Sequence, residues 1–230
     1  MNTLFGQILA SRWTKVVLFA ACLVPFILLL VPFLKLLTTG NAPELGANPV
    51  EYITHHTGDW TIRFLLITLC VTPLRRIFNQ PRLTRYRRML GLFAFFYVCL
   101  HFMTWFILDK SFSLSDMWAD VLKRRFITVG MLGFAMLIPM AVTSTAGWVR
   151  RMGFAKWQRL HRLIYFAALA GVIHYYWLVK SDVRLPLMYG AMLAVLMLYR
   201  VFIWKQAPVK RAPAQRSPAA TSPNTASLPD

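Results

Sequence analysis

Three histidines, His101, His161 and His174, lie in or beside long apolar segments of this 230-residue chain. An imidazole in hydrocarbon needs a partner, because burying a polar group without one costs free energy. His101 lies 12 residues after Met89, and His174 lies 12 residues after Arg162. We expect both segments to rise from the same membrane face, so at 1.5 Å per residue both rings lie roughly 18 Å along their helices. The spacing therefore predicts two imidazoles at the same depth.

Two facing imidazoles suit a haem iron, which can take one axial histidine from each side inside a helix bundle. Ala170 and Gly171 lie one turn below His174 and Ala167 lies a further turn down, where small side chains would leave room for a porphyrin. Small residues also serve close helix packing, and membrane histidines also serve proton relays. Haem binding, a relay or transport role and a purely structural role are therefore the three interpretations of these residues.

His161 lies about 20 Å below His174, near the predicted cytoplasmic face. Thirteen residues separate the two, and at about 100° per residue they point about 140° apart on an ideal helix. A kink, a π-bulge or a frayed helix start near His161 would be needed to align them. Arg87 and Arg88 fall at the depth of His161 and suit a phosphate or carboxylate. They predict an anionic cofactor such as flavin mononucleotide (FMN), or haem propionates, unless they only mark the membrane boundary.

The elements that position these residues are membrane helices. Apolar residues make up 57% of the chain, more than in an ordinary soluble domain. Crossing a bilayer core of about 30 Å takes about 20 apolar residues. We predict an all-α, polytopic membrane bundle of six transmembrane helices at about 16–37, 58–74, 89–108, 126–143, 162–180 and 186–204.

The charges predict the orientation of the bundle. The net charge is +18, and 18 of the 26 Lys and Arg residues flank the spans on one side, whereas seven of the eight acids lie on the other. The positive-inside rule places both termini in the cytoplasm, and it explains the charge without nucleic acid. The exception is the basic run 123–125 on the outer side, which we expect to snorkel or to bind lipid head groups.

The remaining segments carry weaker signals. Cys22, Cys70 and Cys99 are isolated within apolar runs, so they predict no zinc, iron–sulfur or thioredoxin-type site. His55 and His56 fall in a predicted outer loop, where we expect solvated side chains rather than contacts with a partner. We predict a membrane domain over 1–205 and a disordered cytoplasmic tail over 206–230, which is rich in Pro, Ala and Ser.

Three stretches resemble the MsrQ family, also called YedZ, within the ferric-reductase-like transmembrane group. They are HHTGDWTIRFLLITLCVTPLRR at 55–76, RRMLGLFAFFYVCLHF at 87–102 and WQRLHRLIYFAALAGVIHYYWLVK at 157–180. The resemblance covers about residues 5–205. It implies a haem b protein that carries electrons across the inner membrane to MsrP, a periplasmic molybdopterin enzyme that reduces methionine sulfoxide in oxidised envelope proteins.

The resemblance also implies a set of site residues and an electron source. By motif, the haem ligands would be His101, His161 and His174, with Arg87 and Arg88 in the cytoplasmic half of the conduit. FMN is also attributed to the family, and electrons would come from the quinone pool or a cytoplasmic flavin reductase. The chain has no G-x-G-x-x-G motif, so we expect a separate electron donor. We also expect methionine sulfoxide to be reduced in the partner enzyme rather than in this chain.

Two other functions fit the same sequence features. A stand-alone transmembrane ferric reductase would share the fold and differ in its electron acceptor. A non-redox transporter or proton relay, or a scaffold with hydrogen-bonded histidines, would bind no haem.

Overall fold

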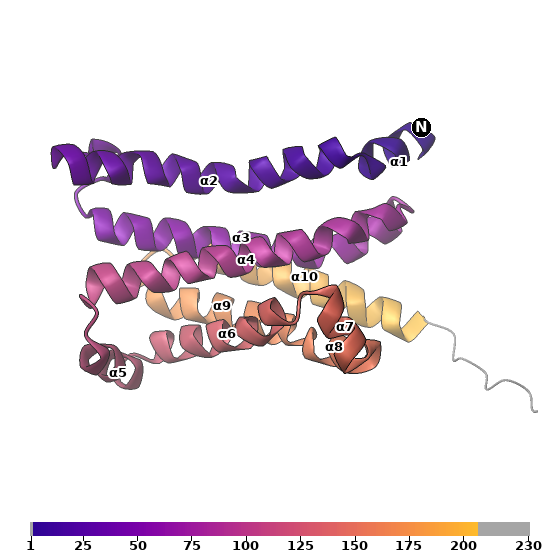
Figure 1. Ribbon diagram of the computed structural model, residues 1–230. Coiled ribbons are helices and arrows are strands. Elements are labelled where there is room, and N and C mark those ends of the chain that lie inside the picture. Colours follow the sequence, from indigo (N-terminus) through magenta and orange to yellow (C-terminus); the bar gives the residue numbers. More distant parts are fainter. Residues whose placement is uncertain (1, 207–230) are drawn as a thin grey trace, which may run out of the picture.

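The computed structural model describes residues 2–206, and the elements in that range are helical (Figure 1). The predicted tail at 206–230 lies outside the described residues, apart from Gln206 at the end of the last helix. The α-helices are α1 (Asn2–Ala10), α2 (Arg12–Thr39), α3 (Pro49–Ile77), α4 (Thr84–Met103), α5 (Leu114–Lys123), α6 (Arg125–Val142), α7 (Ala146–Met152), α8 (Phe154–Leu160), α9 (Leu163–Leu178) and α10 (Arg184–Gln206). Two 3₁₀ turns, η1 (Pro43–Leu45) and η2 (Pro81–Leu83), and a π-helix, η3 (Thr104–Asp109), complete the chain.

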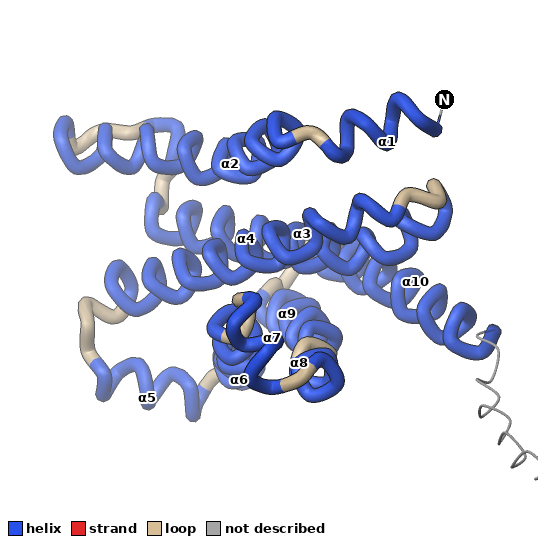
Figure 2. The backbone as a smooth tube through the Cα atoms, turned by 45° about the vertical axis from the view of Figure 1, so that its right-hand side comes forward, coloured by secondary structure: helices blue, strands red, loops and turns tan. Residues whose placement is uncertain are grey.

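The long helices form one bundle. Figure 1 shows α2, α3, α4, α6, α9 and α10 running along a common direction, with α5 and the α2–α3 connection at one end and α7, α8 and the N-terminus at the other. Helix α3 packs chiefly against α4, and α6 packs chiefly against α9, while α10 contacts both α9 and α3. Figure 2 shows α5 set apart from the other helices. The bundle therefore consists of two tightly packed helix pairs with α2, α5 and α10 around them.

Helices cover all six predicted segments, and four of them are long and apolar enough to cross a membrane. These four are Arg12–Thr39, Pro81–Asp109, Arg125–Val142 and Arg184–Ile203. Helix α3 carries charged residues along its first half, and α9 is only 16 residues long. The all-helical membrane fold is thus confirmed, and the count of six spans stays a prediction.

The prediction for the start of α3 was wrong. The helix begins at Pro49 rather than near residue 58, because Asn48 caps it with a side-chain oxygen that accepts from the Glu51 amide at 3.2 Å. Proline at the first helical position suits this start. His55 and His56 therefore lie inside a helix, not in a loop, and both are half-buried.

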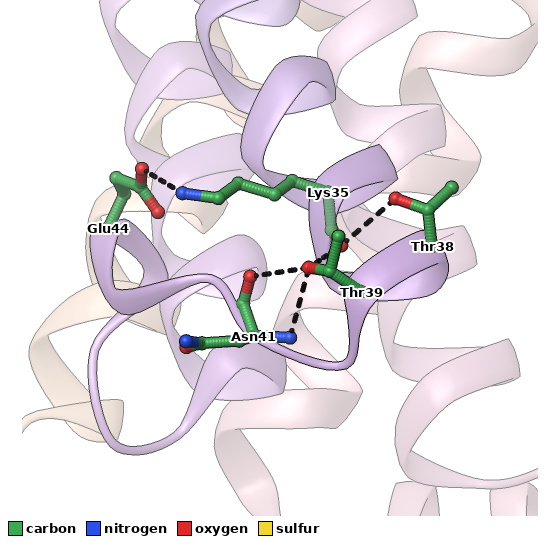
Figure 3. Close-up of polar contacts among 5 residues, drawn as sticks. All are labelled: Lys35, Thr38, Thr39, Asn41 and Glu44. Atoms are coloured by element: carbon green, nitrogen blue, oxygen red, sulfur yellow. Dashed lines mark hydrogen bonds and ion pairs between the residues drawn. The ribbon is translucent and has the colours of Figure 1, made fainter.

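The connection from α2 to α3 is fastened by polar contacts at the end of α2 (Figure 3). Gly40 closes the helix in the left-handed conformation, with φ of 68°. The Thr39 hydroxyl donates to the Lys35 carbonyl at 2.8 Å and accepts from the Asn41 amide at 3.3 Å. Lys35 Nζ lies 2.9 Å from Glu44 Oε1, and this hydrogen bond lowers the pKa of Glu44. The turn thus fixes where α3 begins beside α2.

A tyrosine from α4 is inserted into the hydrogen-bond ladder of α2. The Tyr97 hydroxyl donates to the Cys22 carbonyl at 2.9 Å and accepts from the Phe26 amide at 3.1 Å, beside Pro25. His56 Nε2 lies 3.3 Å from the Pro25 carbonyl. A helix interrupted at proline needs such partners in an apolar environment, because water is absent there. These contacts hold α2 against the α3–α4 pair.

We expect Tyr97→Phe to lower the free energy of unfolding by about 1–3 kcal/mol, because it leaves the part-buried Phe26 amide and the buried Cys22 carbonyl without their partner. The measurement is detergent-titrated unfolding of the full chain, with Tyr176→Phe as control. Tyr176 is 46% exposed, so its variant should change stability by no more than about 0.5 kcal/mol. Equal stability of both variants would contradict the role of Tyr97.

Candidate functional site

A cavity of about 540 Å³ lies between the two helix pairs. Its wall comes from α3, α4 with η3, α6 and α9, and most of it is apolar. The volume is within the range of sites that hold a cofactor or a drug-sized ligand. His101 from α4 and His174 from α9 both belong to this wall.

The two rings lie face to edge, with centroids 6.0 Å apart and planes at 83°. The predicted equality of their depths is therefore confirmed. Metal–imidazole nitrogen bonds are about 2 Å long, so rings at this separation are close enough to share one metal ion when a nitrogen of each ring faces it. The partial exposure of both rings is exposure to the cavity, whose wall they form.

Each ring is oriented by a backbone carbonyl of the helix beside it. His101 Nδ1 lies 2.9 Å from the Thr54 carbonyl oxygen, and His174 Nδ1 lies 2.6 Å from the Phe126 carbonyl oxygen. A carbonyl oxygen only accepts, so each Nδ1 carries the hydrogen. Nε2 of each ring is then the unprotonated nitrogen, the one that can bind a metal. Metal-binding histidines are commonly held in this way by their second nitrogen.

A glycine packs against each ring. A Cβ placed on Gly58 would lie 3.1 Å from His101 Cε1, and a Cβ on Gly130 would lie 2.7 Å from His174 Nδ1. Gly58 follows Thr54 by four residues, and Gly130 follows Phe126 by four. Since Cβ atoms on a helix tilt toward its N-terminus, a side chain at either position would cover the carbonyl that holds the histidine. The α3–α4 and α6–α9 pairs therefore use the same local arrangement.

The rest of the wall carries small and charged residues. The predicted small residues Ala167 and Gly171 line the cavity, and a Cβ on Gly171 would meet nothing within 4 Å. The third, Ala170, is not in the wall and packs against Gly133 instead. Besides His101 and His174, the charged and titratable residues of the wall are Glu51, His55, Asp59, Asp109, Arg124 and Tyr175. The His55 side chain is 41% exposed, so the prediction that it is solvated stays a prediction. His56 Nε2 lies 3.3 Å from the Pro25 carbonyl oxygen instead.

His161 lies away from this cavity, in the turn between α8 and α9. His161 and His174 are therefore not on one continuous helix, and the mismatch of their angles on an ideal helix does not apply to them. Thr143 Oγ1 donates to the Pro139 carbonyl at 2.6 Å and lies 3.1 Å from His161 Nε2, so it accepts from that nitrogen. The Trp157 ring stacks on His161 with centroids 4.0 Å apart. His161 is thus held through Nε2, and its Nδ1 is the nitrogen left to bind a ligand.

The predicted arginines act on His161. Burial, and then the positive charges of Arg87 and Arg88, lower the pKa of His161 to about 4. A third guanidinium, Arg200 of α10, donates to the Tyr165 hydroxyl at 2.7 Å and to the Leu69 carbonyl at 2.9 Å. Its Nε has no hydrogen-bond partner among the described residues. The end of the bundle that holds His161 is therefore rich in positive charge.

Comparison with known proteins agrees with this geometry. Residues 57–172 match the family model of a ferric reductase like transmembrane component. A protein of Herminiimonas arsenicoxydans, called protein-methionine-sulfoxide reductase heme-binding subunit MsrQ, is 52% identical over 77% of this chain and 82% of its own length. A protein of Caulobacter vibrioides with the same name is 53% identical over 74% of this chain and 81% of its own length.

The chain belongs to the MsrQ family. With its apolar helices, this membership makes it a multi-pass bacterial membrane protein. The family match begins within α3 and ends within α9, so it includes His101 and stops two residues before His174.

Sequence reasoning missed the residues that orient the two histidines. Gly58 and Gly130 lie within helices, where glycine costs about 1 kcal/mol relative to alanine and so calls for a reason. That signal was available in the sequence. The carbonyls of Thr54 and Phe126 give no signal, because any residue supplies a carbonyl and only the packing of helix on helix selects one.

Proposed function

We propose that this MsrQ family member binds haem b between His101 and His174 and passes electrons through it. The observation that carries the proposal is the pair of rings 6.0 Å apart, each with Nδ1 on a backbone carbonyl and Nε2 left for the iron. The heme-binding names of its relatives support the same assignment.

The set of donors favours haem over a bare metal ion. In the described part of the chain, no group of three or more His, Cys, Asp or Glu side chains could hold a metal ion. Structural and catalytic metal sites built by protein alone need three or four ligands. Haem brings four ring nitrogens of its own and needs only the axial pair. Arg124, the guanidinium of the cavity wall, is placed to offset the negative charge of the propionates.

Coordination by two histidines suits electron transfer. Haem supplies one-electron chemistry when bound, and two axial imidazoles leave its iron no open position for a substrate. The residues of this chain position the cofactor, exclude water from it and set its charge environment. We propose MsrP, a periplasmic molybdopterin enzyme that reduces methionine sulfoxide, as the acceptor, so that the pathway repairs oxidised periplasmic proteins.

We propose six membrane crossings with both termini in the cytoplasm of the bacterial inner membrane. Figure 1 supports this, because the start of α2, the α3–α4 turn, α7, α8 and the end of α10 meet at one end of the bundle. These segments carry most of the basic residues, as the positive-inside rule expects of a cytoplasmic face. The cavity with His101 and His174 then lies in the periplasmic half.

We propose a second site at the cytoplasmic end, where His161, Arg87 and Arg88 accept electrons from a quinol or from a cytoplasmic flavin reductase. The positive charge that acts on His161, together with the unpaired Nε of Arg200, supports an anionic occupant. FMN, whose phosphate suits arginine, and a second haem bound through His161 are the two candidates. Electrons would pass from this site to the outer haem and then to MsrP.

We expect His101→Ala and His174→Ala each to lose most of the haem, because one axial bond disappears. The measurement is the dithionite-reduced minus oxidised absorption spectrum of the purified protein, with extracted haem quantified. His56→Ala is the control, since His56 lies outside the cavity wall. Full haem content in both axial variants would rule out this pair, and a colourless wild-type protein from haem-replete cells would favour a relay or scaffold.

We expect Gly130→Ala to weaken haem binding by about 10–100-fold, the usual effect of disturbing a residue that orients a metal ligand. The added Cβ would lie 2.7 Å from His174 Nδ1. Gly91→Ala is the matched control, because its Cβ would make only an ordinary contact, 3.7 Å from Thr68. Alanine favours a helix over glycine, so haem loss confined to Gly130→Ala cannot come from a weaker helix. Equal haem affinity in both variants would contradict the arrangement.

We expect His161→Ala to slow reduction of the outer haem from the cytoplasmic side more than it lowers haem content. The experiment uses inverted membrane vesicles, a flavin reductase as donor and the haem spectrum as readout. Reoxidation by MsrP with methionine sulfoxide, compared with reoxidation by ferric citrate, separates the proposed role from a stand-alone ferric reductase. An unchanged rate in His161→Ala would argue against the inner site.

A further inference from the structure

Helix α5 (Leu114–Lys123) is a short helix at the edge of the fold, at the bundle end where α2 turns into α3 (Figures 1 and 2). It packs mainly against α6. Neither the cavity nor the cytoplasmic site uses it. It ends at Lys123, the first residue of the basic run 123–125. The positive-inside rule, which accounts for most of the other basic residues, does not account for this run.

The outward side of α5 is divided lengthwise into an apolar and a polar part. Leu114, Trp118 and Leu122 follow one another at four-residue intervals and are 61%, 59% and 82% exposed. At about 100° per residue they occupy a sector of about 80°. The neighbouring sector holds Ser115, Asp116 and Lys123, all exposed, while Val121 packs inward at 8% exposure.

Ion pairs and hydrogen bonds fix how this helix is turned. Lys110 Nζ lies 2.5 Å from Asp120 Oδ2 and 3.0 Å from Asp109 Oδ2. Arg124 Nε lies 3.4 Å from Asp120 Oδ1. The Ser113 hydroxyl caps the helix by accepting from the Asp116 amide at 3.3 Å. Asp120 thus ties α5 to the end of η3 and to the start of α6, and the apolar stripe is held outward.

The connections of α5 hold it at the membrane boundary. The membrane-crossing segment Pro81–Asp109 ends four residues before α5, and the next, Arg125–Val142, begins after Arg124 alone. Four residues span at most about 14 Å. The end of α5 is therefore held directly at the membrane boundary, and its start lies within about 14 Å of that boundary, whichever side of the membrane this is.

We propose that α5 lies in the lipid–water interface, with Leu114, Trp118 and Leu122 against the acyl boundary and Lys123 and Arg125 on phospholipid phosphates. A helix with this division of its surface is typical of interfacial binding, with its apolar face about 5–10 Å into the boundary. Tryptophan favours this depth, and the two cations complement phosphate. The proposal rests on the membrane embedding of the chain and not on its cofactor. It assigns a role to the basic run on the outer side.

The test measures the depth of spin labels on α5 in nanodiscs of phosphatidylethanolamine and phosphatidylglycerol. Cys22, Cys70 and Cys99 are the free cysteines of the described residues, and each is replaced by alanine in the full chain. Single labels are then attached through Leu114→Cys, Leu122→Cys and, as matched control on the polar sector, Asp116→Cys. Power-saturation spectroscopy compares collisions with oxygen, which enters lipid, and with a water-soluble nickel chelate.

We expect oxygen collisions to exceed nickel collisions several-fold at positions 114 and 122 and the reverse at 116. Nickel collisions at 114 and 122 as frequent as at 116 would overturn the proposal and leave the stripe free for a protein partner. A second measurement needs no cysteine: brominated phospholipids should quench more fluorescence in wild type than in Trp118→Phe. Equal quenching in the two proteins would also overturn the proposal.

Discussion

The candidate site depends on one constraint: a polar group inside a membrane bundle must find its partner in the protein. His101 Nδ1 donates to the Thr54 carbonyl, and His174 Nδ1 donates to the Phe126 carbonyl. A carbonyl in a helix is already an acceptor, and it can receive a second hydrogen only if the surface above it is open. Gly58 and Gly130 open it. Each histidine is thereby held in one tautomer and one orientation before any ligand arrives.

The same constraint accounts for other contacts of the bundle. Buried threonine hydroxyls of α3 donate hydrogen bonds to the carbonyls of residues one turn earlier, as in Thr57, Thr61 and Thr68. Tyr97 serves an amide and a carbonyl of α2 beside a proline. The threonines and Tyr97 thus satisfy backbone groups of their own or a neighbouring helix, whereas His101 and His174 also line the cavity. This difference separates the structural polar groups from the functional ones.

Counting along the sequence was enough to find the helices and to place His101 beside His174, because depth depends only on the rise of 1.5 Å per residue. The angular mismatch between His161 and His174 left open whether the helix is interrupted or His161 serves another site, and the structure places His161 in the turn between α8 and α9. The start of α3 could not be found by counting. Its first two turns hold Glu51, His55 and His56, which resemble a loop in composition, although several of these polar residues face a cavity or a neighbouring helix. The polarity of a residue in the sequence does not show whether its side chain faces water or an internal site.

The position of the cavity has a further consequence for stability. Helix α3 packs chiefly against α4, and α6 chiefly against α9, whereas contacts between the two pairs are sparser. The cavity lies between the pairs, and each supplies one histidine. A group bound to both rings therefore joins two halves that otherwise meet over a smaller surface, so part of its binding free energy is also free energy of their association. This position of the cavity also explains why each helix pair orients its own histidine with its own carbonyl and glycine. Each histidine is oriented by the closely packed pair that contains it, and only the bonds to a shared ligand connect the two pairs.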